Sequence, residues 1–335
     1  MAIRRSWQGI LGLAISAVFL VWALSGLSLG HVWQELRQAR YWYLAPAVLV
    51  YFGAVWARTW RWQWLLRPLA RIRASQLFPV VVIGYMGNNV YPIRAGELIR
   101  AYVLRRNAGV SIAASLATIV VERVFDGLVM LLFVFVALPF AVLPGWLHYT
   151  ILAATALFGA ALLGLMVAAL RPSVIQFLYA LVRPAIPSRL RPRVERLLEL
   201  FIEGLGSLCS PRDVAMLFLT SVVIWLTETT KYWILMHGFP FRVSFFVLML
   251  MTAIVNLATT IPSAPGYAGT FDAPGIKTLV TFGVAESTAA GYTLVLHAAL
   301  WLPITLLGFY YMWRESVSWV DFRTATVQKG ATGTG

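Results

Sequence analysis

A segment dense in hydrogen-bonding and charged groups follows directly after an apolar one. The sequence NNVYPIRAGELIRAYVLRR, residues 88–106, comes after LFPVVVIGYMG. Asn side chains can bond backbone groups freed by a broken helix, and a Pro can begin the next half-helix. Structural capping is one interpretation; the other adds that the turn exposes amide donors, beside nearby Arg side chains, to an anionic head group. The candidate residues of this segment are Asn88, Asn89, Pro92, Arg94, Gly96, Glu97 and Arg100.

The second candidate group lies in the sequence VVERVFDG, where Glu122, Arg123 and Asp126 can share one helix face. About twelve residues separate Asp126 from Pro139, and at about 1.5 Å per residue they cover roughly 18 Å of a hydrocarbon core of about 30 Å. The charges should therefore lie within the bilayer, where each costs on the order of 3 kcal/mol if it faces lipid. They must face the bundle interior or a wet cavity, as part of a transport path or as a structural ion-pair lock.

A second apolar stretch, residues 244–284, is interrupted by Pro and Gly residues. Its candidate site residues are Pro265, Gly266, Gly269 and Asp272. In both stretches an Asn, a Pro, a Gly and an acid precede a Gly-Val pair that opens a long apolar run. Paired Gly/Pro-broken segments of opposite orientation are typical of inverted-repeat transporters. Chance similarity between two broken helices is the alternative.

The composition is that of an integral membrane protein. The 335 residues are 60% hydrophobic and 12% charged, whereas roughly a quarter of the residues in ordinary soluble domains are charged. The single cysteine, Cys209, excludes an internal disulfide, and the four scattered His show no metal-ligand spacing. We therefore expect neither a metal nor another cofactor. His297 lies within a predicted span, where a helix–helix hydrogen bond is the expected role.

The basic residues cluster in segments that are separated by loops with few charges. The net charge is +14, and the clusters include residues 58–73 and 171–212. Such alternation marks cytoplasmic segments by the positive-inside rule, so we expect no nucleic-acid partner. Glu228 and Lys231 are i,i+3 partners in the outer half of a predicted span, and Lys231 could extend its ammonium group to the interface.

We predict an all-α, polytopic integral membrane protein whose N- and C-termini are cytoplasmic. The predicted full spans are roughly 8–29, 43–66, 111–138, 149–170, 213–236 and 286–312. Two re-entrant helical hairpins, at 76–91 and 244–284, enter from opposite faces as a pseudo-inverted repeat, which gives about eight membrane helices. Residues 1–315 form a single transmembrane domain, and 316–335 form a disordered cytoplasmic tail. Within 171–212, an amphipathic helix either lies on the membrane surface or packs on another cytoplasmic segment.

Three motifs, in order, resemble a known family. The sequences GNNVYPIRAGELIRAYVLRRNAGVSIAASLATIVVERVFDG and IPSAPGYAGTFDA are similar to the membrane domain of lysylphosphatidylglycerol synthases and to related flippase-like membrane proteins. The family pattern is approximately N-x(2,3)-P-x-R-x-G-E, then E-R-x-x-D, then P-x-x-P-G-x-x-G-x-x-E. Asp272 stands where the pattern usually has Glu. The resemblance covers nearly the whole chain.

The resemblance implies a domain that moves phospholipids or polyprenyl-phosphate-linked sugars between the leaflets of the cytoplasmic membrane of a prokaryote. In the synthases a separate soluble domain performs aminoacyl transfer, and we do not expect one here. We therefore predict a transporter without catalytic residues, whose partners are lipids with anionic head groups. The alternatives are a membrane enzyme that transfers a glycosyl or acyl group from a lipid carrier, and a membrane partner of a separate lipid-modifying enzyme.

Overall fold

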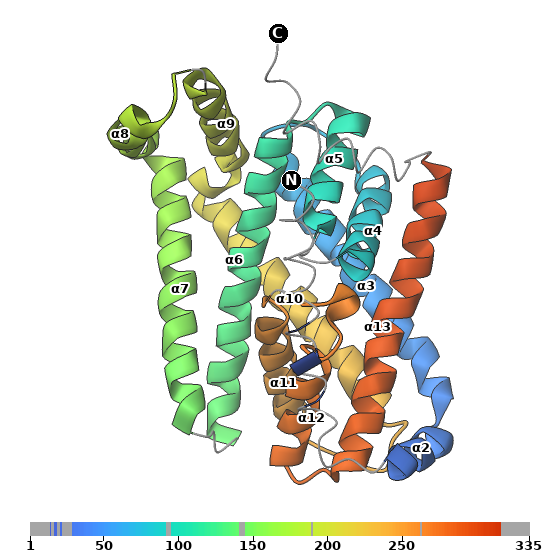
Figure 1. The fold of residues 1–335 in the computed structure, drawn as a ribbon. Helices are drawn as coiled ribbons and strands as arrows, with labels where there is room; N and C mark the ends of the chain where they lie inside the picture. The colour runs from blue at the N-terminus through green and yellow to red at the C-terminus, as the bar shows by residue number, and fades with distance from the viewer. Residues whose placement is uncertain are drawn as a thin grey trace.

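The computed structural model describes residues 14, 17–18, 21, 29–91, 95–140, 145–188, 190–261 and 263–315, and every regular element within these ranges is helical (Figure 1). The predicted all-α class is therefore confirmed. The predicted tail, 316–335, lies outside the described residues. So does the first predicted span, 8–29, apart from isolated positions.

Five long helices form the body of the bundle (Figure 1). These are α3 Leu44–Leu66, α6 Ile112–Ala137, α7 Gly145–Leu170, α10 Pro211–Met236 and α13 Glu286–Arg314. The shorter helices are α2 Leu29–Gln38, α4 Ala74–Val90, α5 Gly96–Ala108, α8 Pro172–Val182, α9 Arg191–Gly204, α11 Phe245–Ala258 and α12 Asp272–Thr281. The short 3-10 turns are η1 Tyr41–Tyr43, η2 Leu138–Phe140, η3 Arg183–Ala185, η4 Gly206–Cys209 and η5 Pro265–Tyr267.

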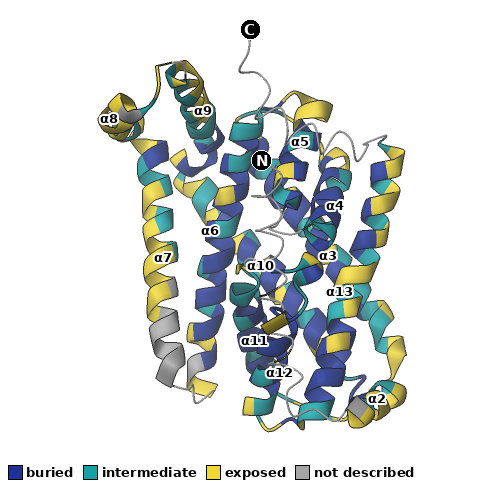
Figure 2. Cartoon of the chain, in the orientation of Figure 1, coloured by how far each residue is buried: buried dark blue, intermediate teal, exposed yellow. Residues whose placement is uncertain are grey.

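The outer surface of the bundle is apolar, as a lipid-facing surface must be. Figure 2 shows exposed residues on α7 and α13. The exposed leucines of α7, α10 and α13 include Leu157, Leu219 and Leu306. By length and composition α10 and α13 could each cross a membrane, and residues 155–170 with α8, bent by 101°, are a further candidate. The predicted number of six full spans is therefore not confirmed.

The helices α4 and α5 form a tightly packed antiparallel hairpin, the first hairpin. The predicted bounds of this hairpin, 76–91, were wrong, because α4 fills them as a single helix and the second arm, α5, follows the break. A Cβ atom at Gly87 would lie 2.8 Å from Gly96 Cα, and one at Gly96 would lie 1.9 Å from the carbonyl oxygen of Gly84. These distances leave no room for a side chain, so the close approach requires glycine. The break between the helices follows from Pro92, since the residue before a proline favours an extended backbone. Tyr91 has φ −104° and ψ 145°.

The helices α11 and α12 form the second hairpin, which is joined through the turn η5. Gly266 (φ 72°) and Tyr267 (φ 62°) are both left-handed, a conformation that is rare for an aromatic residue. The two hairpins lie toward opposite ends of the bundle (Figure 1), and η5 packs against α4. A Cβ atom at Gly266 would lie 3.6 Å from the carbonyl oxygen of Asn89. The fold therefore brings together the two Pro/Gly-broken stretches.

The segment 171–212 contains two helices with different surroundings. The helix α9 packs against α6, because a Cβ atom at Gly204 would lie 2.5 Å from the carbonyl oxygen of Ala114, and Phe201 packs on the main core. The C-terminal end of α9 therefore packs on another segment of the protein, which was one of the two predicted alternatives for this helix. The helix α8 is exposed along its length (Figure 2), with Phe177 and Leu181 each 63% exposed, as suits a helix that contacts lipid.

We expect Gly96→Ala to lower the free energy of unfolding by about 1–3 kcal/mol or more, the range for overpacking a well-packed core. The added methyl group would overlap the Gly84 carbonyl across the first hairpin. Gly53→Ala is the matched control, since nothing lies within 4 Å of a Cβ atom at that position of α3. Thermal denaturation in detergent compares the two variants. Equal midpoints would contradict the packing of the hairpin.

Candidate functional site

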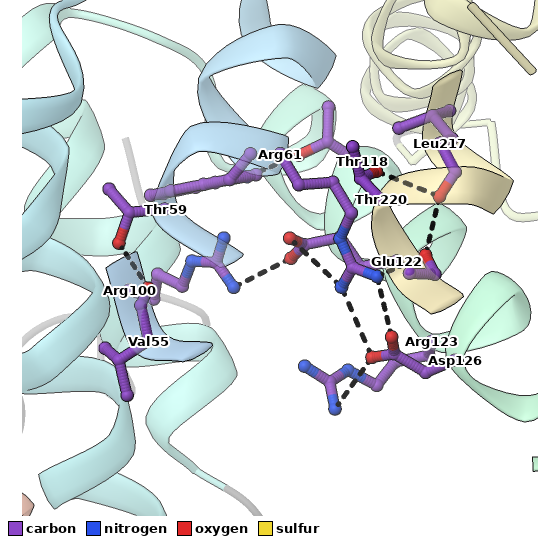
Figure 3. A network of polar contacts seen from close by, with 12 residues as sticks. Val55, Thr59, Arg61, Arg100, Thr118, Glu122, Arg123, Asp126, Leu217 and Thr220 are labelled. Atoms are coloured by element: carbon purple, nitrogen blue, oxygen red, sulfur yellow. Dashed lines mark hydrogen bonds and ion pairs between the residues drawn. The ribbon is translucent and has the colours of Figure 1, made fainter. Parts of the chain in front are cut away.

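A network of buried ion pairs joins α3, α5 and α6 in the interior. Arg61 of α3 donates to Asp126 Oδ1 at 2.7 Å and lies 3.6 Å from Glu122 Oε1. Arg100 of α5 lies 2.8 Å from Glu122 Oε2. Figure 3 shows Arg61 between the two carboxylates, which stand one turn apart on α6. Arg61 is 1% exposed and Glu122 2% exposed, so these charges are compensated inside the protein rather than by water.

Helix α10 completes the hydrogen bonding around Asp126 and Arg61. Trp225 Nε1 donates to Asp126 Oδ1 at 2.9 Å, and Arg61 Nη1 donates to Ser221 Oγ at 2.6 Å. The guanidinium of Arg100 stacks 3.5 Å from the centroid of the Trp62 ring. Aromatic rings and hydroxyl groups therefore supply part of the stabilisation that buried charges need.

One edge of the network is open to the surface. Arg123 lies 3.6 Å from Asp126 and 3.6 Å from Glu97 of α5. The side chains of Arg123 and Glu97 are 32% and 27% exposed, whereas the rest of the network is buried. Glu122 and Asp126 thus face the bundle interior, as predicted from the cost of exposing them to lipid, whereas Arg123 lies at the open edge. This edge is where solvent reaches the network.

A second buried group adjoins the first and consists of Arg58, Glu228 and Lys231. Glu228 of α10 pairs with both Arg58 of α3 and Lys231 of its own helix. The Arg58 guanidinium lies 4.7 Å from the Trp225 ring centroid, so Trp225 separates the two groups. All three residues of this group are less than 8% exposed.

The placement of these cations corrects two expectations. Arg58 and Arg61 do not belong to a cytoplasmic surface cluster over 58–73, because α3 continues to Leu66 and turns both side chains toward the acids of α6 and α10. Lys231 does not extend to the interface, since Glu228 and the Tyr51 ring, 4.4 Å away, hold it inside. The acidic residues of α6 and α10 need cationic partners within the bundle. They were the feature of the sequence that could have predicted the burial of these cations.

The two buried groups together carry an excess of positive charge. The cations are Arg58, Arg61, Arg100, Arg123 and Lys231, and the carboxylates are Glu97, Glu122, Asp126 and Glu228. Among the described residues of these groups, the donors Arg61 Nε, Arg100 Nε and Nη2 and Arg123 Nε have no hydrogen-bond partner, and neither has one acceptor, Glu122 Oε2. A buried donor without a partner is costly, so this region favours an anionic, oxygen-rich group. Within the same ranges no cluster of three or more His, Cys, Asp or Glu side chains could hold a metal ion.

The two Asn residues of the first hairpin have structural roles. Asn88 Oδ1 accepts the Gly96 amide at 2.9 Å and so caps the start of α5. Asn89 Nδ2 donates to Thr305 Oγ1 of α13 at 2.8 Å. The Asn88 contact supports the capping interpretation, whereas Asn89 joins α4 to α13. Pro92 and Arg94 lie outside the described residues.

The acid of the second hairpin is bound locally. Asp272 Oδ2 accepts the Gly269 amide at 2.9 Å, and Asp272 Oδ1 lies 2.8 Å from His297 Nδ1. His297 thus makes the helix–helix hydrogen bond expected of it. Gly266 and Gly269 are buried in the turn, and Pro265 is exposed. The fold therefore assembles Glu97, Arg100, Glu122, Arg123 and Asp126 into one network, while Asp272 has its own partners.

We expect Asp126→Ala to lower the free energy of unfolding by about 3–5 kcal/mol, because Arg61 would keep its charge in the interior without its nearest partner. Glu199→Ala on α9 is the control; its pair with Arg196, at 3.4 Å, is exposed on both sides and should contribute little. Denaturation of both variants in detergent makes the comparison. A small loss for Asp126→Ala would show that the pair is not needed for stability.

The chain is similar in sequence to known membrane proteins over most of its length. A profile described as the lysylphosphatidylglycerol synthase TM region matches residues 9–308. A UPF0104 membrane protein of Methanothermobacter thermautotrophicus is 23% identical over 92% of this chain and 92% of its own length. A UPF0104 membrane protein of Methanocaldococcus jannaschii is 23% identical over 90% of this chain and 93% of its own length.

A shorter similarity is to an enzyme. The glycosyltransferase AglD of Haloferax volcanii is 36% identical over 84 residues, which are 25% of this chain and 14% of that protein. No solved structure matches the chain. Because the family profile covers most of the sequence, the chain belongs to the lysylphosphatidylglycerol synthase transmembrane-region family of membrane proteins.

Proposed function

We propose that this protein is a transporter that moves a lipid with an anionic head group, a phospholipid or a polyprenyl-phosphate-linked sugar, between the leaflets of the cytoplasmic membrane. The observation that carries the proposal is the excess positive charge of the buried groups, with guanidinium N–H groups that lack partners among the described residues. A planar guanidinium group binds phosphate oxygens through several N–H donors. Membership in a family named for lipid synthesis agrees with a lipid ligand.

The path for the head group begins at the open edge, Arg123 and Glu97. From there three guanidinium groups lead inward, those of Arg123, Arg61 and Arg100, each beside a carboxylate of the network. In this proposal the anionic head group pairs with one guanidinium group after another and displaces the carboxylate beside it, so it is never without a cationic partner. The acyl or prenyl tails stay in lipid beside the apolar outer faces of the helices.

The two hairpins provide the alternating access that transport needs. In this proposal both are re-entrant, enter from opposite faces, and form the halves of an inverted repeat with cytoplasmic termini. Their ends meet at Asn89 and Gly266 near the middle of the bundle (Figure 1). Movement of one hairpin end against the other would open the network to one leaflet at a time.

A second candidate function, glycosyl transfer from a lipid carrier, is favoured by the similarity to AglD. An enzyme of that class would use a carboxylate as a general base. The buried carboxylates are instead committed: Glu122 and Asp126 to arginines, Glu228 to Arg58 and Lys231, and Asp272 to His297. This commitment favours transport over catalysis.

Leaflet redistribution of fluorescent lipids in reconstituted vesicles tests the proposal. We expect Arg123→Ala and Glu97→Gln each to slow the redistribution of an anionic lipid by about tenfold or more, the effect of losing a hydrogen bond to a charged group. Arg196→Ala is the matched control, because Arg196 lies on the exposed surface of α9 and should leave the rate unchanged.

Equal rates for all three variants, or equal rates with and without protein, would contradict the transport proposal. Incubation of the purified protein with a lipid-linked sugar separates the two candidate functions. A covalent product formed by the protein alone would establish the enzyme instead.

A further inference from the structure

His297 lies where α13 meets the second hairpin. Its Nδ1 is 2.8 Å from Asp272 Oδ1, and its Nε2 is 2.7 Å from the carbonyl oxygen of Gly266. The first contact ties α13 to the start of α12, and the second ties it to the turn η5. The His297 side chain is 17% exposed and that of Asp272 5%. One imidazole thus joins three parts of the fold.

Both partners of His297 are hydrogen-bond acceptors, which determines how many protons the site holds. A neutral imidazole has one N–H donor and one lone pair, so it can satisfy only one of the two acceptors. Both contacts are favourable only when a proton lies between His297 Nδ1 and Asp272 Oδ1 in addition to the one on Nε2. The Phe271 ring, whose centroid is 4.6 Å from that of the imidazole, is placed to stabilise a cation. A protonated His297–Asp272 pair satisfies both contacts, and a deprotonated pair satisfies one.

Loss of this proton would release the Gly266 contact. The remaining N–H would be retained against the carboxylate, since a hydrogen bond to a charged acceptor is the stronger one. The Nε2 lone pair would then face the lone pairs of the Gly266 carbonyl at 2.7 Å. Asp272 would stay in place because its Oδ2 also accepts the Gly269 amide. Deprotonation would therefore destabilise the turn η5, where the Gly266 carbonyl oxygen loses its donor.

The turn is already strained where this contact holds it. Tyr267, next to Gly266, has φ 62°, and such conformations persist only when their surroundings enforce them. The other side of the turn faces Trp301, whose indole Nε1 would lie 2.6 Å from a Cβ atom at Gly266 and donates to the Asn89 carbonyl at 3.4 Å. Release of Gly266 would thus loosen the junction between the two hairpins.

Among the residues that the structure describes, other titratable groups near this part of α13 come from α10, α3 and α2. Lys231 of α10 and Tyr51 of α3 line a small cavity of about 10 Å³ with Leu296 and Leu300 of α13. The Lys231 ammonium is paired with Glu228. Glu35 of α2 lies further along α13, where a Cβ atom at Gly291 would be 3.3 Å from its Cβ. Asp272 is the carboxylate that contacts the imidazole.

We propose that His297 and Asp272 form a proton-binding site, and that the bound proton locks the end of the second hairpin onto α13. Protonation holds the hairpin ends together, and deprotonation frees them. The proposal rests on the proposed function only in its last step, in which the proton acts as the coupling ion for lipid movement. Proton exchange at this site would then alternate with the opening of the junction.

Amide hydrogen exchange of the segment 263–271, measured on the full chain in detergent from about pH 5 to 9, tests the lock, since an ordinary His titrates within that range. Comparison with His297→Gln at each pH removes the pH dependence of the intrinsic exchange rate. We expect the wild-type segment to exchange about tenfold more slowly than the variant at low pH, and at the same rate at high pH. His237→Gln is the matched control, because His237 is half-buried at the end of α10, far from the second hairpin in sequence, and its Nδ1 lies 2.8 Å from the Trp233 carbonyl oxygen of that helix.

If His297→Gln folds poorly, the same exchange measurement on Asp272→Asn provides a second test. Asn can still accept the Gly269 amide but carries no charge to hold the proton, so the transition should move to lower pH. A wild-type segment whose exchange parallels His297→Gln at every pH, or an Asp272→Asn transition at the wild-type pH, would overturn the proposal. No lipid is transported in this measurement, so a pH-dependent lock without leaflet redistribution would remove the proposed function and keep the proton site.

Discussion

Compensation of charge inside an apolar bundle is the constraint on which the rest of this structure depends. Lipid offers no partner to a buried ion, and a single uncompensated charge would cost several kcal/mol. The carboxylates of α6 and α10 therefore determine which faces of α3 and α5 turn inward, because the guanidinium groups of Arg58, Arg61 and Arg100 must reach them. The helices are oriented by their ion pairs as much as by apolar packing.

The same requirement applies to backbone groups where helices are broken. Side chains close each break: Asn88 binds the amide of Gly96, and Asp272 binds the amide of Gly269. Glycine then permits the close approach that the breaks allow, as at Gly84, Gly87 and Gly96. Polar residues in the two broken stretches thus satisfy the backbone first, and only the charges left over are available to a ligand. This order explains why the network of Arg61, Glu122 and Asp126, rather than the Asn residues, forms the candidate site.

The charged residues of the network differ in their exposure, and so in whether a ligand can reach them. Arg61 and Glu122 are fully enclosed and hold four helices together, whereas Arg123 and Glu97 are partly exposed at the edge. A ligand can compete for the exposed pair at low cost and cannot compete for the enclosed one without moving helices. The junction of the hairpin ends, where Trp301 and His297 contact the turn η5, is placed to permit such a movement.

The sequence by itself determined the all-helical class, the long helices α3, α6, α7, α10 and α13, and the places near Pro92 and within 259–271 where the helices break. Hydrophobic runs, Pro92 and the Gly/Pro pattern of 244–284 act locally, and local rules suffice to predict them. The spacing of Glu122, Arg123 and Asp126 likewise predicted that they face inward. Only the tertiary structure decided which cations they meet. The partners of Asp126 and Glu228 on α3 are 65 and 170 residues away, and no periodicity relates positions so far apart. The inward burial of Arg58, Arg61 and Lys231, and the meeting of His297 with Gly266, follow from how the helices pack around those charges.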